Sequence, residues 1–341
     1  MRAPFDAVSS RLRELYAQAL DETNRNHYDQ ELWRYCGHLK TQKGSATRTR
    51  FVYDLCALAA FDPTDKVVLD AGCGFGALAF ILRFMGAREV QGVDIMESRL
   101  TTFQKMIQDF RVDGVHAHLL PVDATPFPDR YFDMVLSNEA VSHYIDLDGF
   151  LREAARVLKP GGVLLIADGN NGANPKVVQL NYRLWDRFEN GPPGNIDGHH
   201  VNRPYVETRA EIIRQACPEL SPEEVRDLAR RTSYFLKDQI IQAVERYRAA
   251  REMPNSFFQP NKCPIEPTTG ETMENHYHPI ELARHIESFG FRARAYAYFG
   301  GAGGNPLVRL VNWFGQRLTP LTVRWAWAYR IVAWRQDESS G

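Results

Sequence analysis

Residues 67–76, Val-Val-Leu-Asp-Ala-Gly-Cys-Gly-Phe-Gly, place one acid and three alternating glycines directly after an apolar run. The apolar run predicts a buried parallel strand. The glycines predict a tight turn in which the backbone approaches a ligand more closely than a Cβ atom would allow. A helix should begin at Ala77, and its N-terminal amides favour an anionic group. The stretch therefore predicts a small-ligand site at the end of the first strand.

Two cofactor classes fit this turn. Gly72, Gly74 and Ala77, followed by Asp94 at the distance expected of a ribose-binding acid, satisfy the loose fingerprint of dinucleotide-binding proteins. Asp70 distinguishes the two classes, because a carboxylate at that point repels a pyrophosphate and attracts the ammonium or sulfonium of S-adenosylmethionine. We therefore expect S-adenosylmethionine in this site, with a nicotinamide cofactor as the alternative.

Four motifs in order, residues 69–76, 90–94, 121–133 and 158–166, resemble those of the class I S-adenosylmethionine-dependent methyltransferases. The similarity is greatest to the small-molecule branch that includes quinone-biosynthesis enzymes. The resemblance implies that Asp94 binds the ribose hydroxyls and that Asp123 and Ala124 meet the adenine. The full set of cofactor-binding residues that we expect is Asp70, Gly72, Gly74, Gly76, Asp94, Ile95, Asp123, Ala124 and Asn138.

Glu139 and His143 lie four residues apart, just after the fourth predicted strand, whose end borders the transferred methyl group in this family. On a short helix the two side chains would share a face. A hydroxyl acceptor must lose a proton, and histidine is suited to proton transfer near neutral pH. We expect His143 to be the catalytic base, with Glu139 orienting it or binding a substrate cation. The alternative is a His143 that is structural or that helps to hold a metal.

The resemblance and the strand pattern together predict an α/β fold, a Rossmann-like doubly wound sheet of seven strands. Ser9 or Ser10 should cap the first helix. The expected parts are an N-terminal helical lid (1–60), the cofactor-binding core (61–169), a large, mainly helical cap inserted after strand five (170–278), and the last strands with an amphipathic tail (279–341).

The inserted cap departs from the family pattern and should bind the acceptor. Its candidate substrate-binding residues are His199, His200, Arg203, Tyr205, His276 and His278. Arg203 and Tyr205 would clamp an anionic or phenolic acceptor, or else belong to the architecture of the cap. Adjacent histidines are poorly placed to chelate one ion together, and no H-x-x-x-H helix spacing occurs, so we expect no metal site.

Composition limits the remaining possibilities. The 341 residues are 44% hydrophobic, which is ample for a core, and the net charge of −1 gives no global field that would recruit nucleic acid. Five scattered cysteines without a C-x-x-C pair favour a reducing compartment. The N-terminus lacks a signal-peptide core, and no apolar run reaches the roughly 18 residues of a membrane span. We therefore expect a cytoplasmic protein.

Residues 305–325 form a tail in which arginines alternate with tryptophan, phenylalanine and leucine, without any acid. This composition suggests a helix at a membrane interface, or a seat for a lipid-linked acceptor. The alternative, which is the commoner fate of an apolar helix face, is packing on the cap or on a second subunit of a homodimer.

These residues together predict methyl transfer from S-adenosylmethionine to a small organic acceptor, with oxygen as the expected acceptor atom. The alternatives are a non-methylating S-adenosylmethionine-dependent enzyme that catalyses cyclization or decarboxylation, a nicotinamide-dependent oxidoreductase, and a cofactor-binding module without catalysis. Asp70 and the Asp123-Ala124 pair argue against the nicotinamide. The Glu139 and His143 pair argues against the inert module.

Overall fold

A computed structural model describes residues 3–196, 199–270, 272, 274–301 and 306–336. The chain forms two compact units. The first, here called the sheet unit, comprises Met1–Val141, Asp146–Asn171 and His278–Gly341. The second, here called the helical unit, comprises Ser142–Ile145 and Gly172–Tyr277. The helical unit thus includes a short segment that the predicted core range 61–169 contained.

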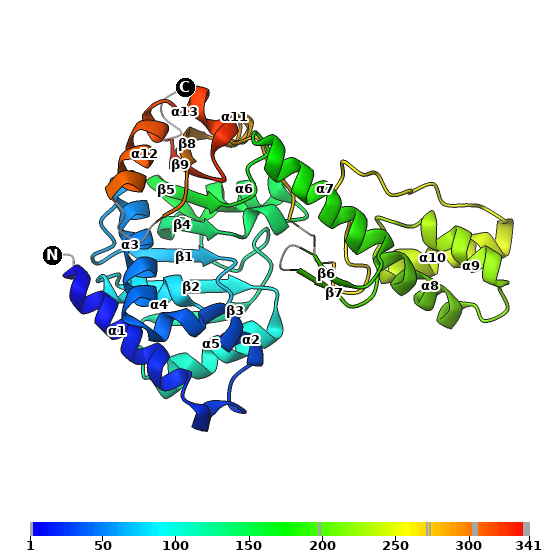
Figure 1. The fold of residues 1–341 in the computed structure, drawn as a ribbon, viewed down its shortest axis with the longest axis horizontal. Helices are drawn as coiled ribbons and strands as arrows, with labels where there is room; N and C mark the ends of the chain where they lie inside the picture. The colour runs from blue at the N-terminus through cyan, green and yellow to red at the C-terminus, as the bar shows by residue number, and fades with distance from the viewer. Residues whose placement is uncertain (1–2, 197–198, 271, 273, 302–305, 337–341) are drawn as a thin grey trace. The chain divides into compact units, whose positions relative to one another are not determined.

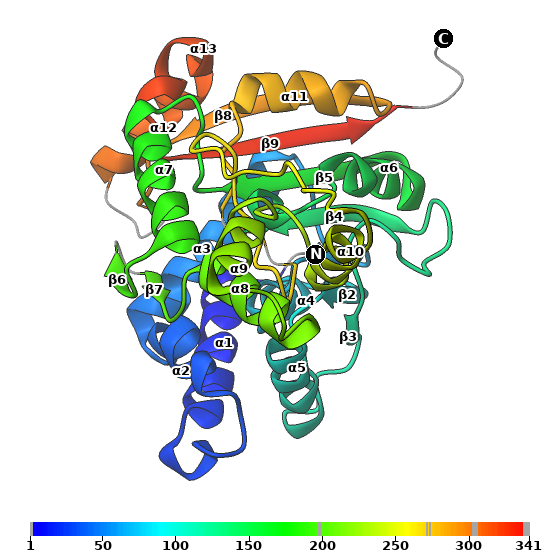
Figure 2. The ribbon, with the colours of Figure 1, turned by 90° about the vertical axis from the view of Figure 1, so that its right-hand side faces the viewer.

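The sheet unit is built on seven strands in the order β3-β2-β1-β4-β5-β9-β8 (Figures 1 and 2). Only β9 runs antiparallel to its neighbours. The strand order reverses direction between β1 and β4, which is where open α/β sheets bind their ligands. The predicted fold class is confirmed. The strands are β1 (Val67–Ala71), β2 (Glu89–Asp94), β3 (Val115–Leu119), β4 (Phe132–Asn138), β5 (Leu158–Asp168), β8 (Phe291–Tyr298) and β9 (Ala328–Arg335).

Helices of the sheet unit bury the strands, and one apolar core joins the sheet to α1, α3, α4 and α5. Strand β1 is buried along its whole length, which explains its unbroken apolar character. The helices are α1 (Phe5–Ala19), α2 (Gln30–Cys36), α3 (Gln42–Leu58), α4 (Ala77–Phe84), α5 (Glu97–Asp109), α6 (Leu147–Val157), α11 (Pro279–Glu287), α12 (Pro306–Arg317) and α13 (Thr319–Thr322).

The predicted N-cap at Ser9 or Ser10 is wrong. Helix α1 begins at Phe5, because Pro4 has the extended backbone of an N-cap and starts the helix about one turn earlier. Ser9 consequently lies inside the helix and is buried against the core.

The helical unit has an apolar core of its own, formed by residues such as Ile213, Leu228 and Ile240. Ser221 and Glu224 form a capping box that starts one of its helices, as the Ser-Pro-Glu-Glu sequence indicates. A small hairpin follows the first helix (Figure 1). The elements are α7 (Pro175–Asn190), β6 (Gly194–Ile196), β7 (His199–Val201), α8 (Tyr205–Ala216), α9 (Pro222–Arg230) and α10 (Lys237–Ala250).

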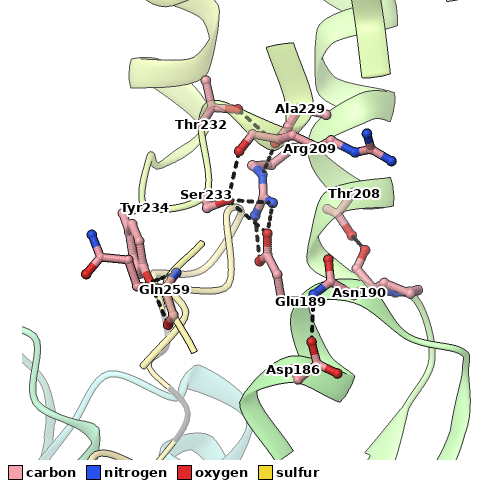
Figure 3. Close-up of polar contacts among 12 residues, drawn as sticks. Asp186, Glu189, Asn190, Thr208, Arg209, Ala229, Thr232, Ser233, Tyr234 and Gln259 are labelled. Atoms are coloured by element: carbon pink, nitrogen blue, oxygen red, sulfur yellow. Dashed lines mark hydrogen bonds and ion pairs between the residues drawn. The ribbon is translucent and has the colours of Figure 1, made fainter. Parts of the chain in front are cut away.

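A buried ion pair ties α7 to α8 inside the helical unit (Figure 3). Arg209 is the largest fully buried side chain, and its guanidinium pairs with the Glu189 carboxylate. Arg209 Nε donates to the carbonyl of Ala229 over 2.8 Å, and the Ser233 hydroxyl donates to Glu189 over 2.9 Å. Both buried charges therefore have hydrogen-bonding partners within the unit.

Candidate functional site

The glycine turn after β1 has the geometry of a ligand cradle. Gly72, Gly74 and Gly76 all have positive φ, at 79°, 52° and 74°, which favours glycine. A Cβ atom at Gly76 would lie 2.0 Å from the ring of Phe103, so α4 can begin only with glycine there. Nothing lies within 4 Å of the Cβ direction of Gly74, which leaves that part of the turn open.

Asp94, at the end of β2, holds this turn in place. Its Oδ2 accepts a hydrogen bond from the backbone N–H of Gly74 over 2.8 Å. Its Oδ1 accepts from the N–H of Met96 over 2.8 Å. A carboxylate oxygen has a second lone pair, so these bonds leave acceptor capacity for a further donor such as a ribose hydroxyl. The carboxylate thus orders the turn in addition to the binding role predicted for it.

Asp70 is buried at the end of β1 with an incomplete set of partners. The side chain is 2% exposed, and its Oδ2 has no hydrogen-bond partner in the described part of the chain. Burial raises the pKa of Asp70 to about 7, while the nearby Arg48 opposes that shift. A buried polar atom without a partner carries a free-energy cost of about 1–3 kcal/mol. A bound cationic group would relieve that cost.

Arg48 on α3 is a functional candidate that the sequence did not reveal. Its guanidinium is half-buried and lies 5.4 Å from the centroid of the Phe51 ring. Its charge lowers the pKa of Asp70, so the two side chains are close in space. No carboxylate forms an ion pair with Arg48 among the residues that the structure describes. Arg48 and Asp70 are therefore oppositely charged side chains near the glycine turn, and each is incompletely paired.

The remaining predicted cofactor residues lie at the same edge of the sheet. Ile95, directly after β2, is 58% exposed. Asp123 and Ala124 follow β3 and are exposed. The Asn138 side chain, at the end of β4, has a buried Oδ1 without a partner among the described residues. This edge therefore offers an apolar platform and unsatisfied acceptors beside the turn.

His143 lies five residues beyond β4, in the part of the helical unit formed by Ser142–Ile145. Its Nδ1 is 3.0 Å from the backbone carbonyl oxygen of Thr272. A carbonyl oxygen can only accept, so Nδ1 carries the proton and Nε2 of the neutral ring keeps its lone pair. The Thr272 hydroxyl in turn donates to the carbonyl of His143. The ring is therefore fixed in the tautomer that a general base requires.

The predicted helix that would carry both Glu139 and His143 does not form. Glu139 has a left-handed backbone with φ 49°, which a helix cannot include. A 3₁₀ turn begins only at Val141 and ends at His143. Glu139 instead uses Oε2 to accept from the N–H of Gly169 over 3.0 Å, which ties it to the end of β5. The group that orients His143 is the Thr272 carbonyl.

His276 belongs to an aromatic cluster of the helical unit. Its ring stacks on Trp185 at 5.0 Å between centroids and 9° between planes, and meets Tyr182 edge-on at 5.5 Å. His276 Nδ1 and Trp185 Nε1 are buried without hydrogen-bond partners among the described residues. Burial lowers the pKa of His276, so its ring is neutral near pH 7. Asn275 donates its N–H to the carbonyl of Ser142 over 2.8 Å, which places the segment carrying His276 beside the segment of His143.

The other predicted acceptor residues are dispersed. His200 Nδ1 hydrogen-bonds across the β6–β7 hairpin to Asn195 over 2.5 Å. Arg203 is exposed, whereas Tyr205 is buried with Phe188 in a small cluster, which favours a structural role for it. His278 is the N-cap residue of α11 in the sheet unit. The side chain of His199 lies outside the described residues.

The described residues contain no group of three or more histidine, cysteine, aspartate or glutamate side chains arranged to hold a metal ion. His116 and His118 share one face of β3, but His118 Nε2 hydrogen-bonds to Gln91 Oε1 over 2.6 Å.

Comparisons with known proteins agree with this arrangement. The family described as "Methyltransferase domain" matches residues 69–166, from β1 to β5. A 2-methyl-6-phytyl-1,4-hydroquinone methyltransferase from Synechocystis is 34% identical over 163 residues, covering 45% of this chain and 50% of that protein. Methyltransferase GfsG from Streptomyces halstedii is 37% identical over 172 residues, covering 48% and 59%. The chain thus spans little more than half the length of these relatives.

Among solved structures, an S-adenosylmethionine-dependent methyltransferase from Mesorhizobium loti aligns with a TM-score of 0.46 and 15% identity. The alignment covers 83% of this chain and 96% of that one.

Proposed function

This chain belongs to the class I S-adenosylmethionine-dependent methyltransferase superfamily, and from that premise we propose that it methylates a small organic acceptor at oxygen. The observation that carries the proposal is the buried Asp70, whose Oδ2 lacks a partner beside the open glycine turn. A cofactor with a cationic amino group supplies the missing partner. A nicotinamide dinucleotide would bring a pyrophosphate toward that acid instead.

The charges beside the turn match the methionine part of the cofactor. We assign Asp70 to its ammonium group and Arg48 to its carboxylate, because each side chain carries the opposite charge and is incompletely paired. Asp94 would accept from the ribose, and Ile95 would cover the adenine, with Asp123 and Ala124 alongside. Bound there, the cofactor supplies an activated methyl group.

For the acceptor we propose His143 and the aromatic pair of Trp185 and His276. His143 would take the proton of an acceptor hydroxyl at Nε2, while the Thr272 carbonyl holds the Nδ1 proton. A positioned base of this kind contributes roughly 10²–10⁴-fold to the rate. The stacked Trp185 and His276 rings would contact the apolar body of the acceptor. A relative that is named for a hydroquinone makes phenolic acceptors the first class to test.

The test is turnover with methyl-labelled S-adenosylmethionine and a panel of phenols, hydroquinones and small carboxylic acids. Product mass reports methyl transfer, and carbon NMR of the labelled methyl distinguishes attachment to oxygen from attachment to carbon. His143→Asn is the informative variant, because its amide N–H can still donate to the Thr272 carbonyl but provides no base. We expect its kcat to fall about 10²–10⁴-fold with little change in cofactor affinity.

His116→Asn is the matched control, since His116 is exposed on β3 and belongs to neither predicted site. Its kcat should equal that of the wild type. Wild-type turnover by His143→Asn would make His143 structural. A methyl group found on carbon would replace the proposed O-methylation with C-methylation.

A further inference from the structure

The C-terminal segment Pro306–Trp327, here called the tail, contains most of the large apolar side chains that are exposed in the described part of the chain. Nine of the sixteen large apolar side chains that are exposed in the described chain lie in it: Leu307, Leu310, Val311, Trp313, Phe314, Leu318, Leu321, Trp325 and Trp327. Scattered exposed apolar residues are ordinary, but a contiguous set marks an interaction surface.

Helix α12 packs against the rest of the sheet unit through its polar side. Asn312 is buried, and it accepts from the N–H of Phe299 over 2.8 Å and donates to the carbonyl of Gly300 over 2.9 Å. Gly315 faces the same way, since a Cβ atom there would lie 2.4 Å from the Phe299 ring. Thr319, at the start of α13, accepts from the N–H of Ala297 over 3.0 Å.

The apolar side chains of α12 are consequently left largely exposed. Leu307, Leu310, Phe314 and Leu318 recur at helical spacing and are 48–68% exposed. This is the reverse of the usual amphipathic helix, which buries its apolar stripe in the core. Between α12, α13 and Phe299 lies an apolar groove of about 280 Å³.

The exposed charges of the tail are all positive. Arg309, Arg317 and Arg324 are exposed, and no acid occurs between residues 306 and 327, although the whole chain has a net charge of −1. The Arg317 guanidinium lies 3.7 Å from the centroid of the Trp313 ring, which keeps cation and aromatic ring together at the surface. Tryptophan beside arginine is the composition that favours the interface of an anionic bilayer.

No helix among the described residues is both long and apolar enough to cross a membrane. The twelve residues of α12 extend about 18 Å at 1.5 Å per residue, against a hydrocarbon thickness of about 30 Å. We propose that the tail lies in the plane of an anionic lipid bilayer, with its apolar side in the acyl boundary and its arginines at the phosphates. This proposal goes beyond methyl transfer and does not depend on it.

The test is flotation of the full-length protein with phosphatidylcholine vesicles, with and without phosphatidylglycerol. The wild type should float with the anionic vesicles, and added salt should weaken its retention because salt screens the arginines. Leu321→Gln/Trp325→Gln removes two exposed side chains, 67% and 62% exposed, that do not line the groove. We expect the partition coefficient of that variant to fall about tenfold or more.

Two matched variants separate the contributions. Arg309→Gln/Arg317→Gln/Arg324→Gln should abolish the preference for anionic over neutral vesicles. Met253→Gln/Phe257→Gln changes exposed apolar residues of the helical unit and should float like the wild type. Thermal unfolding of each variant serves as a check on folding that is independent of lipid and cofactor.

A wild type that stays at the bottom of the gradient with both kinds of vesicle would overturn the proposal. So would equal flotation of the wild type and folded Leu321→Gln/Trp325→Gln. Light scattering that shows a dimer dissociated by the same two substitutions, without vesicle binding, would assign the surface to a second copy of the chain instead.

Discussion

The two units of this protein each bury a carboxylate, and they treat it in opposite ways. Glu189 of the helical unit is 1% exposed and receives Arg209 and Ser233 (Figure 3). Asp70 of the sheet unit is 2% exposed, yet its Oδ2 has no partner among the described residues and its pKa is raised by burial to about 7. Glu189 thus has its hydrogen-bonding partners within the fold, whereas one oxygen of Asp70 has none.

This difference distinguishes a carboxylate that stabilises the fold from one that can accept a ligand. A buried charge stays ionised only when partners replace the water that it has lost. Glu189 has those partners in the chain, so its role ends with holding α7 to α8. In the proposed function a bound cation would supply the partner that Asp70 lacks, and the neighbouring Arg48 would supply the matching charge for an anion. Incomplete pairing, rather than burial alone, is therefore the reason for proposing a ligand site at Asp70.

The largest effect on stability is expected from breaking the buried ion pair of Glu189 and Arg209. Arg209→Met leaves Glu189 buried without its cation and should lower the free energy of unfolding of the helical unit by about 3–5 kcal/mol. Denaturant titration followed by circular dichroism measures this loss. Glu189→Leu/Arg209→Met is the control, since it removes both charges and should recover much of the stability. A wild-type denaturation curve for Arg209→Met would show that the pair contributes nothing.

Asp70 should change how the stability of the ligand-free protein depends on pH. Because the folded pKa of Asp70 is raised to about 7, the unfolded chain releases this proton between about pH 4 and pH 7 while the folded chain retains it. Folding stability should therefore fall as pH rises through that window, by up to about 4 kcal/mol from this group.

Asp70→Asn removes that component of the pH dependence. Its thermal midpoint at pH 8 should exceed that of the ligand-free wild type, and the two proteins should converge near pH 4. Parallel pH profiles for the two proteins would mean that Asp70 ionises in the folded state as it does in water.

A smaller effect is expected on cofactor affinity, and it has the opposite sign. Asp70→Asn should weaken S-adenosylmethionine binding about 10–100-fold, because the amide cannot pair with the ammonium as a carboxylate does. Wild-type affinity should improve as pH rises toward 7 and Asp70 loses its proton, whereas affinity of the variant should not. Equal affinity and equal pH dependence in the two proteins would remove Asp70 from the site.

The smallest expected effect on cofactor affinity concerns the turn itself. Asp94→Asn keeps the shape of the side chain but turns an N–H₂ group toward one of the two backbone donors, Gly74 or Met96. We expect a loss of about 1–3 kcal/mol in stability and a fall in cofactor affinity of about tenfold. Calorimetry and thermal unfolding of the same preparation measure both. An unchanged affinity would confine Asp94 to ordering the turn.

The glycine turn after β1 could be predicted from the sequence because its signals are local. An apolar run, an acid and glycines that need positive φ lie within ten residues, and each has a direct backbone meaning. Residues whose role depends on packing between distant segments were missed. Arg48 reaches Asp70 only because α3 packs beside the sheet, and Thr272 reaches His143 across 129 positions.

Other features were misjudged for reasons equally physical. The spacing of Glu139 and His143 suggests a shared helix face, but Glu139 adopts a left-handed backbone and caps the end of β5. The substrate-binding roles of His200, Arg203 and Tyr205 stay predictions. Their positions could not be foreseen, because the inserted segment folds around a core that no local pattern specifies.

Calorimetric titration of the purified protein with S-adenosylmethionine, S-adenosylhomocysteine and NADH tests the central claim most directly. We predict that S-adenosylmethionine and S-adenosylhomocysteine bind and that NADH does not. Asp70→Asn should weaken the binding of both sulfur ligands. Binding of NADH without the sulfur ligands would mean that the incomplete acid beside the glycine turn serves a different cofactor, and it would contradict the proposed function.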